Sequence, residues 1–401
     1  MKPAHCFIII LLGVFQNTFA QEWEVVSSPP QFLSHHSFGF SLDGMGYLVT
    51  GASGNDQSAR DDFYQYDPNT DNWTQLNDFE TPRAFGIGDT HDGKAYFGFG
   101  TDVFEYHNDL WAYDSQTSTW EELSSCPCTA RIHPALVAIN GKVYMGLGGG
   151  SGENLGDWWE YDIETDSWQE KASFPGPNRH HPYQFGIGDY VYVGLGHGND
   201  IYNDLYRYDP ATDSWTEMAS LPGEARVAGT QFSHNGKGYV LSGEGDDHGP
   251  METGEFWMYD PSINDWELLT EHPGTSRWAP ASFIIDDEIY LINGMVRDFS
   301  NSNFLYQDVT YKFTLDASSS ISEAENSEVK VYPNPTQNLL TVELAGAEHS
   351  TVSLLNSLGQ SVLELTEKEQ REDKVILNLS SLETGLYYLK VGEFTTKVQK
   401  M

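Results

Sequence analysis

Aromatic residues recur along most of the chain at a nearly constant spacing. Consecutive tryptophans of one set are 47 to 51 residues apart, and the set comprises Trp23, Trp73, Trp120, Trp168, Trp215 and Trp266. Seven residues before each of the last five stands a tyrosine followed by an aspartate, as in Tyr161-Asp162 before Trp168. A period near 50 residues is typical of a repeat architecture, in which one supersecondary unit stacks on copies of itself.

Each repeat also contains a tight turn that leads into an apolar run with a tyrosine and a glycine-rich end. The turns are Asp43-Gly44, Asp92-Gly93, Asn140-Gly141, Gly188-Asp189, Asn235-Gly236 and Asp286-Asp287. Most of these dipeptides tolerate the positive φ angles of short hairpins, so each unit is predicted to be a four-stranded antiparallel meander. Because radially stacked sheets bury tryptophan and tyrosine between neighbours, the repeat predicts a β-propeller.

The two ends of the repeat predict the number of blades. The sixth unit reaches its third strand at Tyr311-Lys312-Phe313 and then enters a serine-rich segment without a tryptophan. Trp23 lies 24 residues before Tyr47, and the other tryptophans lie 23 or 24 residues before the next hairpin tyrosine. We therefore expect a six-bladed propeller over residues 21–316, in which the N-terminal strand 21–27 completes blade six.

These units resemble the kelch family, whose repeat has a glycine-rich end to its second strand, a tyrosine and a tryptophan near its close. The glycines stand in Gly146-Leu147-Gly148-Gly149 and Gly194-Leu195-Gly196, whereas the sixth unit has only Asn293-Gly294. The resemblance implies an all-β fold, a six-bladed kelch β-propeller. Members of this family serve as protein-binding platforms, glycan-binding modules and a few enzymes, so the resemblance alone does not fix a function.

The N-terminus has the three parts of a secretory signal peptide. Lys2 supplies a positive charge, Phe7–Phe15 an apolar stretch and Thr18-Phe19-Ala20 a small-residue cleavage site, which predicts a signal peptide over residues 1–20. The apolar stretch is too short for a membrane-spanning helix, so we expect no transmembrane segment in the mature chain. Cys6 precedes this stretch, which disfavours a lipid anchor at the cleavage site.

A second domain is predicted at the C-terminus. Residues 317–328 are serine-rich and acidic, as in a linker, and alternating Leu340, Val342 and Leu344 predict a small β-sandwich over residues 329–401. Three motifs accompany this pattern: Val331-Tyr332-Pro333-Asn334-Pro335, Leu358-Gly359-Gln360 and Gly385-Leu386-Tyr387-Tyr388-Leu389-Lys390-Val391.

Together these motifs resemble the C-terminal sorting domain, of type A, that the type IX secretion system of Bacteroidota recognises. The resemblance implies that the secretion machinery is a partner and that the protein is secreted or held at the outer-membrane cell surface. The residues expected to carry the sorting signal are Pro333, Asn334, Pro335, Gly359, Gly385 and Tyr387.

Charge and composition narrow the choice of partners. With 59 acidic and 21 basic residues the formal net charge is −38, which excludes an unassisted nucleic-acid binder. The chain is 39% hydrophobic and 13% aromatic, too apolar for intrinsic disorder. We therefore expect an exported monomer whose partner is an extracellular glycan or protein.

Arginine recurs at the entry to the first strand of five repeats. These residues are Arg83, Arg131, Arg179, Arg226 and Arg277, with Ser34 at the corresponding place in the first repeat. Guanidinium groups bind carboxylate or sulfate through paired hydrogen bonds, so a ring of five predicts an anion-binding face. Alternatively, each arginine braces neighbouring backbone or an adjacent acid. Asp109, Asp157 and Asp204 recur just before the third strand, where we expect them to cap the loop.

Histidine occupies three repeats two residues further along. His36, His133 and His181 are candidate ligand-binding residues at the same level of the propeller. Three histidines could ligate zinc or copper. However, blade two separates the blade of His36 from the blade of His133, so convergence requires a narrow axis. We therefore expect hydrogen-bonded strand residues, with no metal and no cofactor.

We favour a non-catalytic binding module, and an enzyme is the alternative. Exported kelch proteins similar to N-acetylneuraminate mutarotases interconvert the anomers of an acidic sugar, and by that resemblance an arginine would hold the carboxylate. Glu244 or His181 would move a proton between the ring oxygen and the anomeric hydroxyl. Copper-radical oxidation, which galactose-oxidase-like kelch propellers perform, needs a thioether-linked tyrosine, and Cys126 and Cys128 sit together around Pro127 as a local disulfide or two free thiols.

Overall fold

The computed structural model divides into two units, which meet in sequence at Leu315 and Asp316. It describes residues 22–30, 34–53, 58–298 and 303–315 of the first unit. In the second unit it describes residues 329–332, 336–344, 352–355, 361–365, 374–382, 384–391 and 394–400. The expected signal peptide and linker lie outside these residues, as do Pro333, Asn334, Pro335 and Gly359. The described residues contain no helix that is long and apolar enough to cross a membrane.

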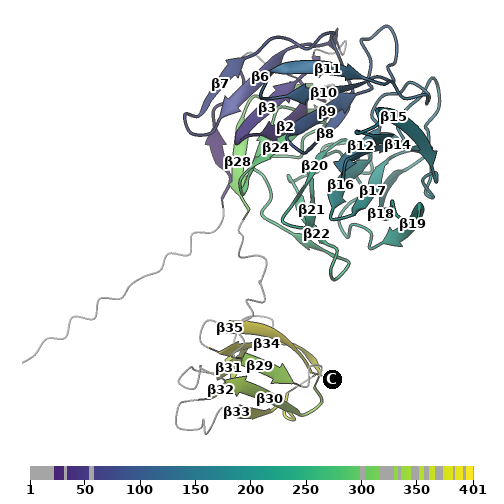
Figure 1. Ribbon diagram of the computed structural model, residues 1–401. Coiled ribbons are helices and arrows are strands. Elements are labelled where there is room, and N and C mark those ends of the chain that lie inside the picture. Colours follow the sequence, from purple (N-terminus) through teal and green to yellow (C-terminus); the bar gives the residue numbers. More distant parts are fainter. Residues whose placement is uncertain are drawn as a thin grey trace, which may run out of the picture. The chain divides into compact units, whose positions relative to one another are not determined.

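Six four-stranded antiparallel sheets surround a common axis in the first unit, as the repeat predicts (Figure 1). Blade one consists of β2 (Phe38–Leu42), β3 (Met45–Val49), β6 (Phe63–Asp67) and β7 (Asn72–Gln75). Blade two consists of β8 (Ile87–His91), β9 (Lys94–Gly98), β10 (Leu110–Asp114) and β11 (Thr119–Leu123). Blade three consists of β12 (Ala135–Ile139), β13 (Lys142–Gly146), β14 (Trp158–Asp162) and β15 (Ser167–Lys171).

The remaining blades follow the same meander. Blade four consists of β16 (Tyr183–Ile187), β17 (Tyr190–His197), β18 (Ile201–Asp209) and β19 (Ser214–Met218). Blade five consists of β20 (Thr230–His234), β21 (Lys237–Leu241), β22 (Phe256–Asp260) and β23 (Asp265–Leu268). Blade six consists of β24 (Ala281–Ile285), β25 (Glu288–Ile292), β28 (Thr310–Thr314) and β1 (Glu24–Val26).

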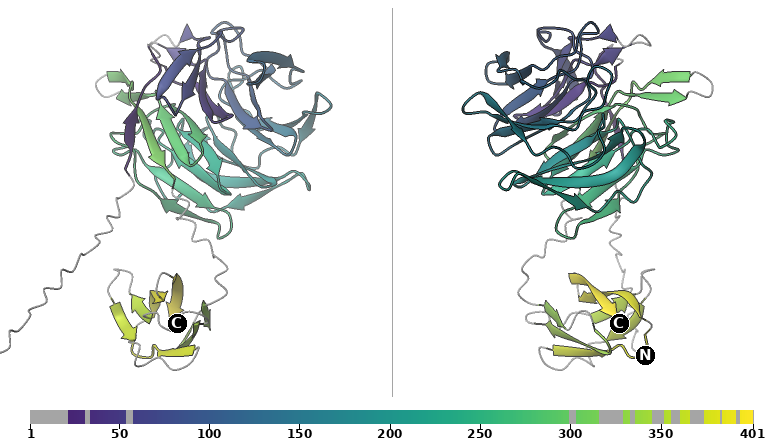
Figure 2. Two further views of the ribbon diagram at one scale, coloured as in Figure 1. Left: turned by 60° about the vertical axis from the view of Figure 1, so that its left-hand side comes forward. Right: turned by 90° about the vertical axis from the view of Figure 1, so that its right-hand side faces the viewer.

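The N-terminal strand joins the last blade. β1 runs antiparallel to β28, with Glu24 opposite Lys312 and Val26 opposite Thr310. The loops between the second and third strands emerge at one end of the propeller, here called the loop face. Two of them contain short hairpins, β4 (Ala52–Ser53) with β5 (Ser58–Ala59) and β26 (Met295–Asp298) with β27 (Asn303–Tyr306). Figure 2 shows the second hairpin in green, projecting from the ring.

The recurrent tryptophan and tyrosine join most blades to the preceding blade by hydrogen bonds. Trp168 Nε1 donates to the backbone oxygen of Ser124, which directly follows blade two. The Ser124 backbone N–H donates to Asp166 Oδ1, which also accepts the Tyr161 hydroxyl. The same tryptophan bond joins Trp73 to Ser27, Trp215 to Ala172 and Trp266 to Ala219. The periodic residues therefore supply both buried area and directional contacts between blades.

The second unit has the two sheets of a small sandwich. One contains β29 (Val329–Tyr332), β30 (Leu339–Leu344) and β33 (Lys374–Asn378). The other contains β31 (Val352–Leu355), β32 (Ser361–Leu365), β34 (Gly385–Val391) and β35 (Phe394–Lys400). Leu340 and Val342 are buried with Leu389 in the shared core, whereas Leu339 is exposed, as the alternation predicts. Tyr387 also belongs to this core, and Gly385 begins β34.

Candidate functional site

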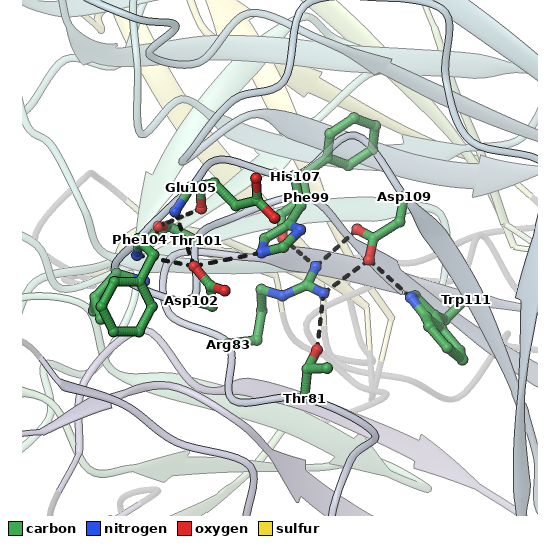
Figure 3. A network of polar contacts seen from close by, with 11 residues as sticks. Thr81, Arg83, Phe99, Thr101, Asp102, Phe104, Glu105, His107, Asp109 and Trp111 are labelled. Atoms are coloured by element: carbon green, nitrogen blue, oxygen red, sulfur yellow. Dashed lines mark hydrogen bonds and ion pairs between the residues drawn. The ribbon is translucent and has the colours of Figure 1, made fainter.

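The recurrent arginines lie inside the blades. Arg83 is buried, and its Nη1 and Nη2 donate to the two carboxylate oxygens of Asp109 at 2.7 and 2.8 Å (Figure 3). Nη1 also donates to the Phe99 backbone oxygen at 2.8 Å, and Trp111 Nε1 donates to the same carboxylate. We call this arrangement the arginine clamp, because it joins the start of the first strand to both ends of the loop between the second and third strands.

The arginine clamp recurs in full in blades three and four and in part in blade five, where Nη1 of Arg226 has no partner among the described residues. Its ion pairs are Arg131 with Asp157, Arg179 with Asp204 and Arg226 with Glu255. In blade six, Arg277 Nη1 instead donates to the backbone oxygens of Asn293 and Val309. All five side chains are buried. This placement differs from the expected anion-binding face and matches the bracing alternative, because an external anion would have to replace a partner that the blade already supplies.

The ion pairs hold the acids in their charged form. Burial alone would raise the pKa of Asp109, but the hydrogen bonds and positive charge of Arg83 outweigh it and lower that pKa. The pKa of Asp157 is lowered in the same way by Arg131. For Glu255 burial is again the largest influence, and the hydrogen bonds from Trp257 and Arg226 reverse it and lower the pKa.

The three candidate histidines converge on the propeller axis. One ring nitrogen from each of His36, His133 and His181 lies within 4.8 Å of the other two. His36 Nε2 and His181 Nε2 are 2.8 Å apart, and the rings of His133 and His181 stack with centroids 3.5 Å apart. The narrow axis that the sequence could not establish is thus present, and blade two contributes Phe85 beside His133.

These imidazoles are neutral at ordinary pH. Burial is the largest cause that holds the pKa of His36 well below its usual value, and neighbouring histidines act in the same direction. Burial and the same crowding lower the pKa of His133 and of His181. His35 lies beside His36 with a pKa lowered to about 3, chiefly by burial.

Glu244 belongs to an ion pair near the same axis. Its buried carboxylate accepts Arg297 Nε at 2.5 Å and Arg297 Nη2, and the Arg297 guanidinium lies 3.7 Å from the centroid of the Trp278 ring. Burial raises the pKa of Glu244, although the hydrogen bonds from Arg297 oppose this. A role for Glu244 or His181 in proton transfer stays a prediction. Arg297 was missed by the sequence analysis because it lies outside the repeat.

The loop of blade two presents apolar side chains to solvent. Phe104 is 92% exposed, and Val103 and Tyr106 are 50% and 40% exposed. Asp102 Oδ1 accepts the backbone N–H groups of Phe104 and Glu105, each at 2.9 Å, which shapes the turn. Figure 3 shows the loop beside the Arg83 clamp. Phe104 was not among the residues expected from the sequence, although two apolar residues between acids in a polar loop were a usable signal.

A depression on the loop face adjoins Tyr106. Its lining includes His133, His180, Glu153, Asn154 and Asn199, which come from blades three and four.

Cys126 and Cys128 form a disulfide that is buried in the core between blades two and three. The disulfide is therefore part of the scaffold and not of the exposed surface.

Family models match both parts of the chain. The KLHDC2/KLHL20/DRC7 Kelch-repeats domain matches residues 14–173, and the Kelch motif matches residues 188–222. The Secretion system C-terminal sorting domain matches residues 330–401. No curated protein matches the chain. The matched ranges fall on the propeller and on the sandwich respectively.

Proposed function

We propose that this chain, which carries kelch repeats and ends in a secretion-system sorting domain, is an exported module that binds a protein partner through its loop face. The sorting domain indicates export, with secretion or cell-surface attachment. Kelch repeats suggest protein binding. The proposal that the loop face contacts the partner rests on one observation, which is the exposed aromatic side chain of Phe104 at the tip of an anchored loop.

The exposure of Phe104 supports a role for this side chain in contacting a partner rather than in stabilising the fold. A phenylalanine that is almost fully exposed gains no burial from the fold, whereas an aromatic side chain that enters a partner's pocket is a common source of binding energy. The loop is pre-organised: Thr101 Oγ1 donates to the Glu105 backbone oxygen at 2.7 Å and accepts the Val103 N–H at 3.0 Å. Pre-organisation reduces the entropy lost on binding.

Charge around Phe104 indicates the chemistry of the partner. Asp102 and Glu105 flank it, and hydrogen bonds from the backbone N–H groups lower the pKa of Asp102, so its carboxylate stays ionised. The whole chain carries a formal charge of −38. A partner with an apolar pocket bordered by lysine or arginine is complementary to this surface, and its association rate should fall as salt is raised.

The test is site-specific photo-crosslinking followed by affinity measurement. A photoreactive phenylalanine analogue replaces Phe104 in one sample and Ile263 in another, and each purified protein is added to cells of the source organism. Ile263 is the matched control, because it is 67% exposed and lies in the turn between β22 and β23, at the end opposite the loop face. We expect one protein to be captured from position 104 alone.

Affinity for the captured protein is then measured with Phe104→Ala and Ile263→Ala. We expect Phe104→Ala to weaken binding at least about tenfold, as for an aromatic at the centre of an interface, and Ile263→Ala to leave it unchanged. Equal capture from both positions, or equal affinity of both variants, would overturn the proposal. A glycan array run in parallel would move the proposal to a carbohydrate ligand if binding there depends on Phe104.

A further inference from the structure

The convergence of His36, His133 and His181 is imposed by the backbone of the innermost strands. Each residue precedes a first strand and has a positive φ, between 49° and 55°. The backbone N–H of His133 donates to Phe85 at 3.0 Å and that of His181 donates to His133 at 3.1 Å, so main-chain bonds pass from blade to blade. Three imidazoles from different blades are thus fixed at one level around the axis.

Hydrogen-bonding capacity in this cluster is incompletely used. Neither ring nitrogen of His133, nor Nδ1 of His181, has a partner among the described residues, although these atoms have almost no solvent-accessible surface. An enclosed polar atom without a partner costs about 1–3 kcal/mol. Phe85 and Trp278 border the histidines, and neither provides a hydrogen-bond acceptor for an imidazole ring in the contacts described. A species that accepts several nitrogen lone pairs would satisfy the cluster.

We propose that His36, His133 and His181 bind a divalent transition-metal ion at the propeller axis, with Zn²⁺ as the ion of first choice. Neutral imidazole is a preferred ligand of zinc, and three histidines with one open position are a common zinc geometry. Ligand nitrogens of a tetrahedral zinc site lie about 3.3 Å apart for Zn–N bonds of about 2.0–2.1 Å. The 2.8 Å between His36 and His181 therefore has to lengthen slightly. The ring of His133, whose ligand nitrogen lies within 4.8 Å of the other two, has to turn out of its stack on His181 to direct a lone pair at the ion.

A neighbouring histidine orients one ligand. His35 Nδ1 lies 2.6 Å from His36 Nδ1, so a proton shared there leaves His36 Nε2 free to face the cluster. An outer-shell hydrogen bond of this kind fixes the tautomer of a metal-bound histidine. His36 Nε2 is also the atom nearest His181 Nε2, which places the ligand lone pairs on the side where the three rings meet.

The open coordination position has room for a small ligand. The three histidines border a cavity of about 110 Å³ in the central channel, and Gln184 and Thr230 also line it. At about 30 Å³ per water molecule, this space admits a few waters or one small oxygen ligand such as a carboxylate. The inference does not depend on the Phe104 loop, so it stands or falls separately from the proposed partner.

The test uses the full secreted chain, purified without a polyhistidine tag and freed of metal by dialysis against a chelator. Zn²⁺ is titrated by calorimetry, and Co²⁺ is titrated by visible absorption as a spectroscopic substitute. We expect one equivalent of each ion to bind, with the intense visible bands of tetrahedral cobalt. His133→Gln should lower the affinity for Zn²⁺ at least about a hundredfold, because outer-shell changes alone already cost 10–100-fold.

His234→Gln is the matched control, since His234 ends β20 and pairs with Asp287 far from the three ligands in sequence. It should bind Zn²⁺ as the unaltered chain does. Failure of the unaltered chain to bind a stoichiometric ion overturns the proposal whether or not the variants fold. Binding that survives in His133→Gln but is lost in His248→Gln would also overturn it, because the ion would then belong to His197 and His248, whose rings are 4.6 Å apart.

Discussion

Trp23 Nε1 donates a 3.0 Å hydrogen bond to the backbone oxygen of Thr270, although 247 residues separate the two in sequence. Trp168 makes the equivalent bond to Ser124 of the preceding blade, so Trp23 takes the tryptophan position of blade six. The propeller is thus closed by the same contact that joins its interior blades.

Removal of this contact should destabilise the propeller. We expect deletion of residues 21–27 to lower the melting temperature sharply, because β28 loses its outer neighbour and blade five loses the bond to Thr270. Trp23→Ala should lower the free energy of unfolding by about 3 kcal/mol, at the lower end of the range for a buried tryptophan. Differential scanning calorimetry measures both changes. Val25→Ala, on the same strand with a 69% exposed side chain, is the control and should have little effect.

The arginine clamp should be sensitive to loss of one partner. Asp157→Asn leaves the buried Arg131 guanidinium without its counter-ion, which typically costs about 3–5 kcal/mol. The double variant Arg131→Met with Asp157→Asn should be more stable than Asp157→Asn alone, because no buried charge remains. Urea unfolding of the unaltered chain, Arg131→Met, Asp157→Asn and the double variant provides the free energies. Additive losses would contradict a coupled pair.

Stability should fall in mild acid because of His272. Its ring is buried against Ser242, and burial followed by the charge of Arg277 lowers its pKa to about 4. In the unfolded chain the pKa is about 6.5, so below that pH the unfolded chain binds a proton that the folded chain does not. The contribution of the neutral His272 to the free energy of unfolding is therefore fully present above about pH 6.5 and is lost as the pH falls toward about 4.

The measurement compares the free energy of unfolding at pH 7.5 and pH 5. Between about pH 6.5 and pH 5 one such histidine contributes a loss of about 2 kcal/mol, at about 1.4 kcal/mol for each pH unit. In His272→Gln the free energy of unfolding should fall by about 2 kcal/mol less between these pH values than in the unaltered chain. In His234→Gln it should fall as much as in the unaltered chain. Identical pH dependence in His272→Gln and the unaltered chain would rule out this origin of the acid sensitivity.

The junction between blades one and two offers a stabilising substitution. Ser118 has a φ of 54° at the place where blade three has Asp166, and Trp120 Nε1 has no partner among the described residues. Ser118→Asp would supply a carboxylate like that of Asp166, which accepts the Tyr161 hydroxyl and the Ser124 backbone N–H at the next junction. Aspartate also tolerates this backbone region better than serine. We expect a gain of about 1 kcal/mol in the free energy of unfolding. A lower melting temperature would show that the blade-two junction differs for another reason.

The periodic aromatics were sufficient to predict the blades, because the tryptophan contact of Trp168 recurs at every junction but that of Trp120. It is made by Trp23, Trp73, Trp215 and Trp266. The direction of an arginine side chain was not predictable in the same way. Arg83 could point to solvent or to Asp109, and their separation of 26 positions in sequence gives no sign of the pairing. The meeting of His36 with His181 depended on the radius of the axis, which is set by how closely the first strands approach. Sequence spacing does not encode that distance.

Blade five closes its arginine clamp with a different acid at a greater separation. Arg226 and Glu255 are 29 residues apart, whereas Arg179 and Asp204 are 25 apart. Each acid directly precedes the residue that pairs with the second strand at the equivalent position, Leu205 with Gly194 and Phe256 with Leu241. The intervening loop has therefore changed length while the anchor has stayed. In evolutionary terms, insertions can accumulate in this loop without loss of the blade's internal attachment. Variation of the loop face is thereby separated from maintenance of the ring beneath it.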